Sequence, residues 1–122
     1  MGPVNWIAVG VAWVVAALLG VTFHGRAATP RAAYGQHALA AVLLFVSVAM
    51  IGHMFARVGA DTLAAKPWLY FMMSGGLALT FIGPALLITA VRRGDPMRRA
   101  LFDAGYFLAA FLAIGAVFLA LA

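Results

Sequence analysis

Four long apolar runs, separated by short segments that hold every Lys and Arg, constrain this chain of 122 residues more than any other feature. The runs cover about residues 4–23, 36–55, 68–91 and 100–122. An α-helix rises about 1.5 Å per residue, so roughly 20 apolar residues cross a hydrocarbon core about 30 Å thick. We therefore predict an all-α polytopic membrane protein, a four-transmembrane-helix bundle in which residues 1–122 form a single domain.

The overall composition supports lipid as the solvent of this chain. Apolar residues make up 66% of it and charged residues 9%, whereas about 25% of the residues of a typical soluble domain are charged. The net charge of +5 is divided among short connectors, which favours contact with anionic lipid head groups over nucleic-acid binding. The chain has no cysteine, so disulfides and thiolate metal sites are excluded.

The distribution of basic residues predicts the orientation of the spans. The first and third connectors carry six arginines, which are Arg26, Arg31, Arg92, Arg93, Arg98 and Arg99. The second connector carries only Arg57 and Lys66. Because Lys and Arg are retained on the cytoplasmic side, we predict that the first and third connectors lie in the cytosol. Both termini would then lie outside, on the periplasmic side of a bacterial inner (plasma) membrane.

Small residues at helical spacing predict where the spans pack against one another. Lipid tails are as apolar as the side chains, so helices approach closely only where small residues allow it. The candidate packing residues are Ala8, Ala12, Ala16, Gly20, Gly76, Gly105, Ala109 and Ala113. The alternative is that alanine is simply abundant in this chain. Pro84, inside the third span, is expected to kink it.

Asp103 is the only acidic residue inside a predicted span, and ionisable residues in such places are candidates for function. Arg99 precedes it by four residues, so an i,i+4 ion pair at the membrane interface is the simpler interpretation. Together with Tyr106, Thr80 and the break at Pro84, Asp103 could instead line a path for protons or cations. The chain would then be a small transporter or channel.

A second cluster predicts a different chemistry. Met50, His53 and Met54 share one face of the second span, and Met72 and Met73 lie near the start of the third. Thioethers and imidazole are ligands that suit Cu(I), so copper handling is a third hypothesis. Methionine also fills gaps in apolar packing, which is the alternative interpretation.

Enzymatic machinery is scarce in this sequence. The chain has no glutamate and no cysteine, and Ser47 and Ser74 lie in apolar runs without an evident base. A nucleophile needs a base and a group that orients the base. We therefore expect no enzymatic activity and no cofactor. The favoured interpretation is a non-catalytic helical bundle that forms a homo-oligomer or serves as an accessory subunit of a larger membrane complex.

The two ends of the chain resemble a known family. The segments VNWIAVGVAWVVAALLG, GADTL and FDAGYFLAAFLAIGAVFLALA are similar to the bacterial membrane family named domain of unknown function 1761. Members commonly begin with Asn-Trp, here Asn5 and Trp6, and close with an Asn-Ala-Gly-Tyr motif, here residues 103–106. This chain has Asp103 in place of the usual Asn, and GVTFHGRAATP in place of a Trp-Tyr-Ser-Pro-like turn. The resemblance implies a four-helix membrane protein and supplies no activity.

Overall fold

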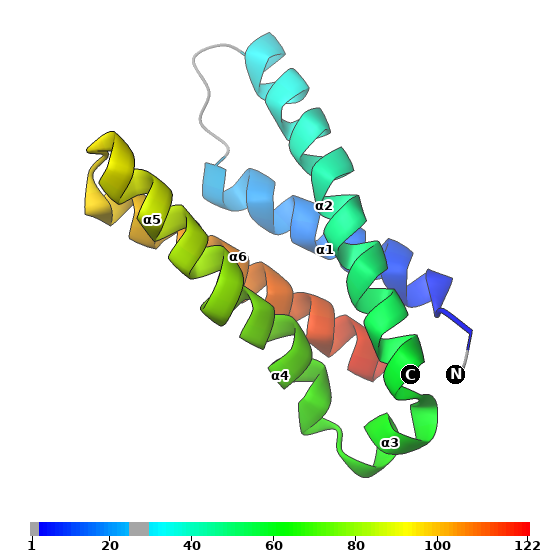
Figure 1. The fold of residues 1–122 in the computed structure, drawn as a ribbon. Coiled ribbons are helices and arrows are strands. Elements are labelled where there is room, and N and C mark those ends of the chain that lie inside the picture. Colours follow the sequence, from blue (N-terminus) through cyan, green and yellow to red (C-terminus); the bar gives the residue numbers. More distant parts are fainter. Residues whose placement is uncertain (1–2, 25–29) are drawn as a thin grey trace.

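The computed structural model describes residues 3–24 and 30–122, and every regular element in these ranges is a helix. The order is α1 (Trp6–His24), α2 (Pro30–Val58), α3 (Ala60–Ala65), α4 (Trp68–Leu77), the π-helix η1 (Ala78–Ile82), α5 (Gly83–Arg93) and α6 (Met97–Ala120) (Figure 1). The described residues contain four spans that are long and apolar enough to cross a membrane, namely Trp6–Phe23, Gly35–Val58, Trp68–Arg93 and Met97–Ala120. The predicted fold class, an all-α protein with four such spans, is confirmed.

The start of α1 is joined to the end of α6 by one side chain. Oδ1 of Asn5 accepts a hydrogen bond from the backbone N–H of Ala8 at 3.1 Å, which caps α1. The amide nitrogen of the same side chain donates to the carbonyl oxygen of Leu121 at 3.0 Å. The two ends of the chain therefore lie at the same end of the molecule (Figure 1), as an even number of spans requires.

The third span continues past its proline through a widened turn. Pro84 has no N–H, and its ring would clash with the carbonyl of Thr80 in a regular α-helix. The π-helix η1 ends at Ile82, two residues before this proline, and the N–H of Gly83 bonds to the carbonyl of Ala78. Because the wider turn accommodates the ring, α4, η1 and α5 together form one span from Trp68 to Arg93.

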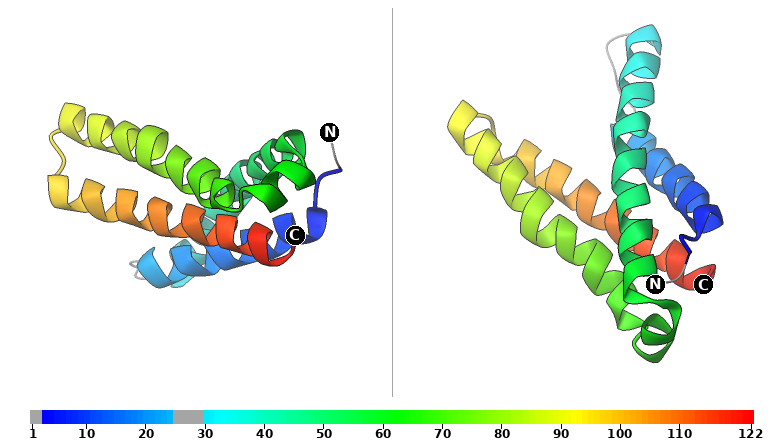
Figure 2. Two further views of the ribbon diagram at one scale, coloured as in Figure 1. Left: turned by 90° about the horizontal axis from the view of Figure 1, so that it is seen from below. Right: turned by 45° about the vertical axis from the view of Figure 1, so that its right-hand side comes forward.

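The helices are packed unevenly along the bundle. Helix α6 packs against α1, α4 and α5, whereas α2 packs along α1 and meets α4 near its own C-terminal end. Away from that end, α2 diverges from the α5–α6 pair (Figures 1 and 2). We call the half that contains the chain ends and α3 the terminal half, and the half that contains the α5–α6 turn the connector half.

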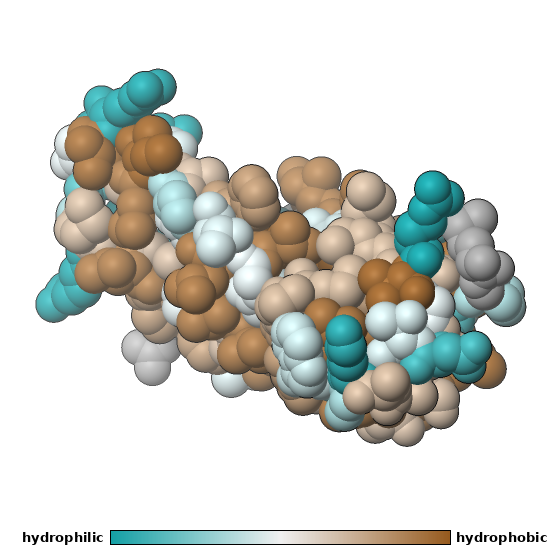
Figure 3. All heavy atoms as spheres, turned by 60° about the horizontal axis from the view of Figure 1, so that its bottom comes forward, coloured by the Kyte–Doolittle hydropathy of each residue, from teal (hydrophilic) through white to brown (hydrophobic). Residues whose placement is uncertain are grey.

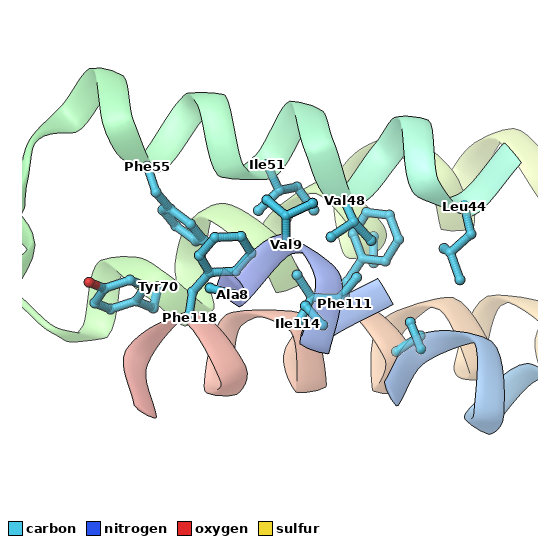
Figure 4. Packing of buried hydrophobic residues seen from close by; sticks show 14 of the residues in the cluster. Ala8, Val9, Leu44, Val48, Ile51, Phe55, Tyr70, Phe111, Ile114 and Phe118 are labelled. Carbon is cyan, nitrogen blue, oxygen red and sulfur yellow. The ribbon is translucent and has the colours of Figure 1, made fainter. Parts of the chain in front are cut away.

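Apolar side chains fill the terminal half closely. The cluster there includes Ile51, Ile114 and Phe118, each at most 3% exposed (Figure 4). The ring of Phe55 lies 4.9 Å from that of Tyr70 and 5.0 Å from that of Phe118, measured between centroids. Tilted aromatic contacts at these distances stabilise a core beyond simple burial of area.

Glycine sets the distance between α4 and α6. A Cβ atom added at Gly115 would collide with Oγ of Ser74 and lie 2.7 Å from the carbonyl oxygen of Tyr70. The Ser74 hydroxyl is buried and donates to that same carbonyl at 2.7 Å. The backbones of α4 and α6 therefore lie so close together that position 115 has no room for a side chain.

Only a minority of the residues in each span are fully buried within the chain. The buried share is between 22 and 33% in the apolar 18-residue windows that define the spans. Apolar surface lies between hydrophilic groups that gather toward the two ends of the molecule (Figure 3). This surface is compatible with a multi-pass protein whose spans contact the lipid bilayer.

The arginines of the third connector gather at the α5–α6 turn, where Arg92, Arg93, Arg98 and Arg99 are all exposed. Arg26 and the side chain of Arg31, in the first connector, lie outside the part of the chain that the structure describes. The side of the membrane that these connectors face stays a prediction.

Candidate functional site

A cleft of about 700 Å³ opens in the connector half, between α1, α2, α5 and α6. It lies where α2 diverges from the α5–α6 pair (Figure 2). Most of the described residues that line it are apolar or aromatic, and the others are Gln36, His37, Asp103 and Tyr106. Pockets of small-molecule size hold about 300–1,000 Å³ and combine apolar walls with a few polar groups in the same way.

Tyr106 joins one wall of the cleft to α1. Its hydroxyl donates a hydrogen bond to the carbonyl oxygen of Ala16 at 3.2 Å. The same hydroxyl lies 2.9 Å from the position that a Cβ at Gly20 would occupy, so this glycine leaves room for it. The ring is buried and lies 5.6 Å from the ring of Phe23 and 4.9 Å from that of Phe107. Tyr106 therefore fixes α6 against α1.

Trp13 joins α1 to α2 at the cleft. The sequence analysis did not single out this residue. Its Nε1–H donates to the carbonyl oxygen of Ala41 at 2.7 Å, and its ring lies 5.3 Å from that of Phe45. Its position in the middle of an apolar run could have indicated a contact with another helix, because an indole N–H away from water needs an acceptor. Trp13 connects α1 to α2 at the level of the cleft.

Asp103 lies on the cleft wall one helical turn before Tyr106 and is partly exposed. His37 and Gln36 line the cleft from α2. Trp13 and Tyr106 each donate a hydrogen bond to a backbone carbonyl, and Asp103 also makes an interaction within the protein. The cleft wall thus carries a carboxylate, an imidazole and an amide. Asp103 is the only acidic side chain among the described residues that line this cleft.

Arg99 lies outside the cleft, as do two of the residues predicted to line a cation path. Arg99 is exposed one turn before Asp103. Thr80 is exposed, and its hydroxyl donates to the carbonyl of Gly76 at 2.6 Å within its own span. Pro84 is exposed as well. The structure thus brings Asp103 and Tyr106 together and leaves Thr80 and Pro84 elsewhere.

The residues of the predicted copper site lie in different environments. Nδ1 of His53 lies 2.8 Å from the carbonyl oxygen of Ala49, so this nitrogen carries the proton. The ring packs edge-on against Trp6 at 5.6 Å. Met50 and Met72 are more than half exposed, and Met54 is partly buried. Met73 packs against the core.

Within residues 3–24 and 30–122, no group of three or more His, Cys, Asp or Glu side chains is placed to hold a metal ion. This observation concerns nitrogen, thiolate and carboxylate ligands and leaves the methionines untested, so Cu(I) handling stays a prediction.

The candidate packing residues occupy two different environments. Ala8, Ala12 and Ala16 are 0% exposed, and Gly20 lies beneath Tyr106. Gly76 and Gly105, by contrast, have no atom within 4 Å of an added Cβ, and Ala109 and Ala113 are partly exposed. The close contacts of α4 with α6 are made instead by Gly75 and Gly115. Successive residues are rotated by about 100° around the helix axis, so a shift of one position in the sequence decides whether a glycine faces a neighbouring helix.

A second cleft of about 520 Å³ lies in the terminal half, next to α3. Its polar lining comes from Asn5 and Tyr70, and no charged side chain lines it among the described residues. Between the two clefts lie Val48, Ile51 and Ile114, each at most 1% exposed. The described residues thus place an apolar core between the clefts.

Comparison of the chain with protein-family models, with curated proteins and with solved structures found no match in any of the three.

Proposed function

We propose that this chain is a non-catalytic membrane helical bundle that acts by associating with other helices inside the bilayer, first of all with a second copy of itself. The observation that carries the proposal is the position of Gly105 on the outer surface of α6. It is exposed, and an added Cβ there would meet nothing within 4 Å. Ala109 and Ala113 follow at four-residue intervals and are partly exposed. We call these three residues the outer stripe.

The chain itself supports the interpretation of such a stripe as a contact surface. On α1, Ala8, Ala12 and Ala16 have the same spacing and are fully buried within the bundle, where α1 packs against α2 and α6. A stripe of small residues on the lipid-facing surface of α6 offers the same close approach to a helix from outside. A second copy of α6 brings an identical, self-complementary stripe, as a two-fold interface requires.

We also propose that the protein lies in a bacterial inner membrane, with the first and third connectors in the cytosol. The relation to the family named domain of unknown function 1761 is part of the same proposal. An accessory role in a larger membrane complex would use the same outer stripe. Transport of protons or cations is less well supported, because an apolar core separates the two clefts and Thr80 lies away from Asp103.

The test uses the absence of native cysteine in the chain. A single cysteine in place of Ala109 is expected to form a disulfide-linked dimer in lipid vesicles on mild oxidation. A single cysteine in place of Leu79, which is 65% exposed on η1, is the matched control and should remain monomeric. Adding Gly105→Leu to the Ala109→Cys variant should abolish most of the dimer, whereas adding Gly10→Leu, also at an open position, should not.

Two results would contradict the proposal. Equal cross-linking at positions 79 and 109 would indicate random collision. A strictly monomeric mass in mild detergent, with no cross-linking at either position, would remove self-association altogether. A complex with a larger partner that Gly105→Leu dissociates would support the accessory-subunit form instead.

A further inference from the structure

We propose that the cleft of the connector half binds an amphipathic organic cation, with its positive group at Asp103 and its apolar part against α1 and α2. No residue of the outer stripe lines the cleft, and Gly105 is turned by about 200° from Asp103 around α6. The inference is therefore independent of self-association.

The walls of the cleft favour an organic ligand. Val14, Leu18 and Val21 line it from α1, and Ala41 and Leu44 line it from α2. These side chains offer no hydrogen bonds and gain free energy when an apolar group displaces water or loosely packed lipid from them. The volume of about 700 Å³ is large enough for a molecule with several rings.

The charge in the cleft favours a cation. Asp103 is the only acidic group among the described residues that line it. Asp103 makes an interaction within the protein, and a carboxylate, with about four acceptor positions, can accept from a ligand as well as from such a partner. Aromatic side chains also attract organic cations, and Trp13, Tyr106 and Phe107 all line the same cleft.

Inorganic cations fit this site poorly. Ca²⁺ and Mg²⁺ take about six or more oxygen ligands. Among the described residues that line the cleft, only Gln36, Asp103 and Tyr106 carry a side-chain oxygen, which is fewer than such an ion requires. The exposed arginines of the α5–α6 turn also oppose the approach of a hydrated cation from the water at this end. An amphipathic cation can instead dissolve in the bilayer and reach the apolar walls of the cleft from there.

The experiment compares two probes of matched shape and opposite charge, tetraphenylphosphonium and tetraphenylborate. Binding of each to the full chain in mild detergent is measured by equilibrium dialysis against empty micelles. We expect the cation to bind at least about tenfold more tightly than the anion, a difference of about 1.4 kcal/mol. The variant Asp103→Asn should lose that preference. Asp103→Glu should keep it, and Asp95→Asn, at an exposed carboxylate in the α5–α6 turn, should leave it unchanged.

A second pair of variants keeps the proposal testable if Asp103→Asn does not fold, as judged by its elution and helical circular dichroism. Leu86→Trp narrows the cleft without changing its charge and should weaken binding of the cation several-fold. Leu79→Trp, on the outward surface, is its control and should have no effect. Equal binding of both probes to the wild-type protein, or a folded Asp103→Asn variant that retains the preference, would overturn the proposal. Tighter binding of the anion would also overturn it and would indicate a site for an anionic lipid.

Discussion

The terminal and connector halves of the bundle are built from the same long helices and differ in how closely these helices meet. In the terminal half, Gly115 lets α6 approach the backbone of α4, and the rings of Phe55, Tyr70 and Phe118 fill the space beside them. In the connector half, α2 leaves the α5–α6 pair, and a cleft of about 700 Å³ takes the place of a core.

The difference follows from the side chains that each half would have to bury. The terminal half brings together apolar residues and one serine whose hydroxyl is satisfied by a backbone carbonyl. The connector half would have to bury Gln36, His37 and Asp103 against one another. Burying a polar group costs free energy unless all of its hydrogen bonds are replaced, so these residues favour an open arrangement. The closely packed terminal half thus holds the helices together, whereas the connector half stays open.

The largest effect is expected where the terminal half is tightest. Gly115→Leu should lower the free energy of unfolding by about 3 kcal/mol, because the new side chain collides with Ser74 and the backbone of Tyr70. Unfolding by SDS in mixed micelles, followed by circular dichroism, measures the change. Gly76→Leu, at an open position in the same bundle, should stay within about 0.5 kcal/mol of the wild type. Equal losses in both variants would mean that glycine does not set the α4–α6 distance.

A smaller effect is expected at the junction of the chain ends. Asn5→Ala removes the cap of α1 and the hydrogen bond to Leu121, so it should cost about 1–2 kcal/mol in the same unfolding assay. The control is Thr22→Ala in the connector half. The Thr22 hydroxyl bonds only to the carbonyl of Leu18 one turn earlier, so its loss should cost less than about 0.5 kcal/mol. A neutral Asn5→Ala variant would show that this junction does not stabilise the terminal half.

The smallest effect is expected for a large side chain placed in the connector half. Ala38 is exposed and lines the cleft, so Ala38→Phe should change the free energy of unfolding by less than about 0.5 kcal/mol. Ala110→Phe makes the same change at a position that is 0% exposed, and it should cost about 1–3 kcal/mol through overpacking. If Ala38→Phe were as costly as Ala110→Phe, the cleft would be filled in the membrane by another helix.

The sequence by itself determined the number of spans, their approximate limits and the return of both chain ends to one side. Length and hydropathy suffice for these features, because a helix needs about 20 consecutive apolar residues to cross the hydrocarbon core of a bilayer. The first span was expected to begin near residue 4, and α1 begins at Trp6. The short helix α3 and the π-helix η1 could not be read from the apolar runs, since both depend on how the chain turns locally.

The tertiary structure alone decided which face of each span is buried. Gly75 and Gly115 make the close contacts, whereas Gly76 and Gly105, equally plausible in the sequence, face open space. Asp103 shares a cleft with Tyr106 and not with Thr80 for the same reason. A span that is apolar all round carries little periodic signal, because lipid tails and a protein core accept the same side chains. The rotation of each helix is fixed only when its neighbours are in place.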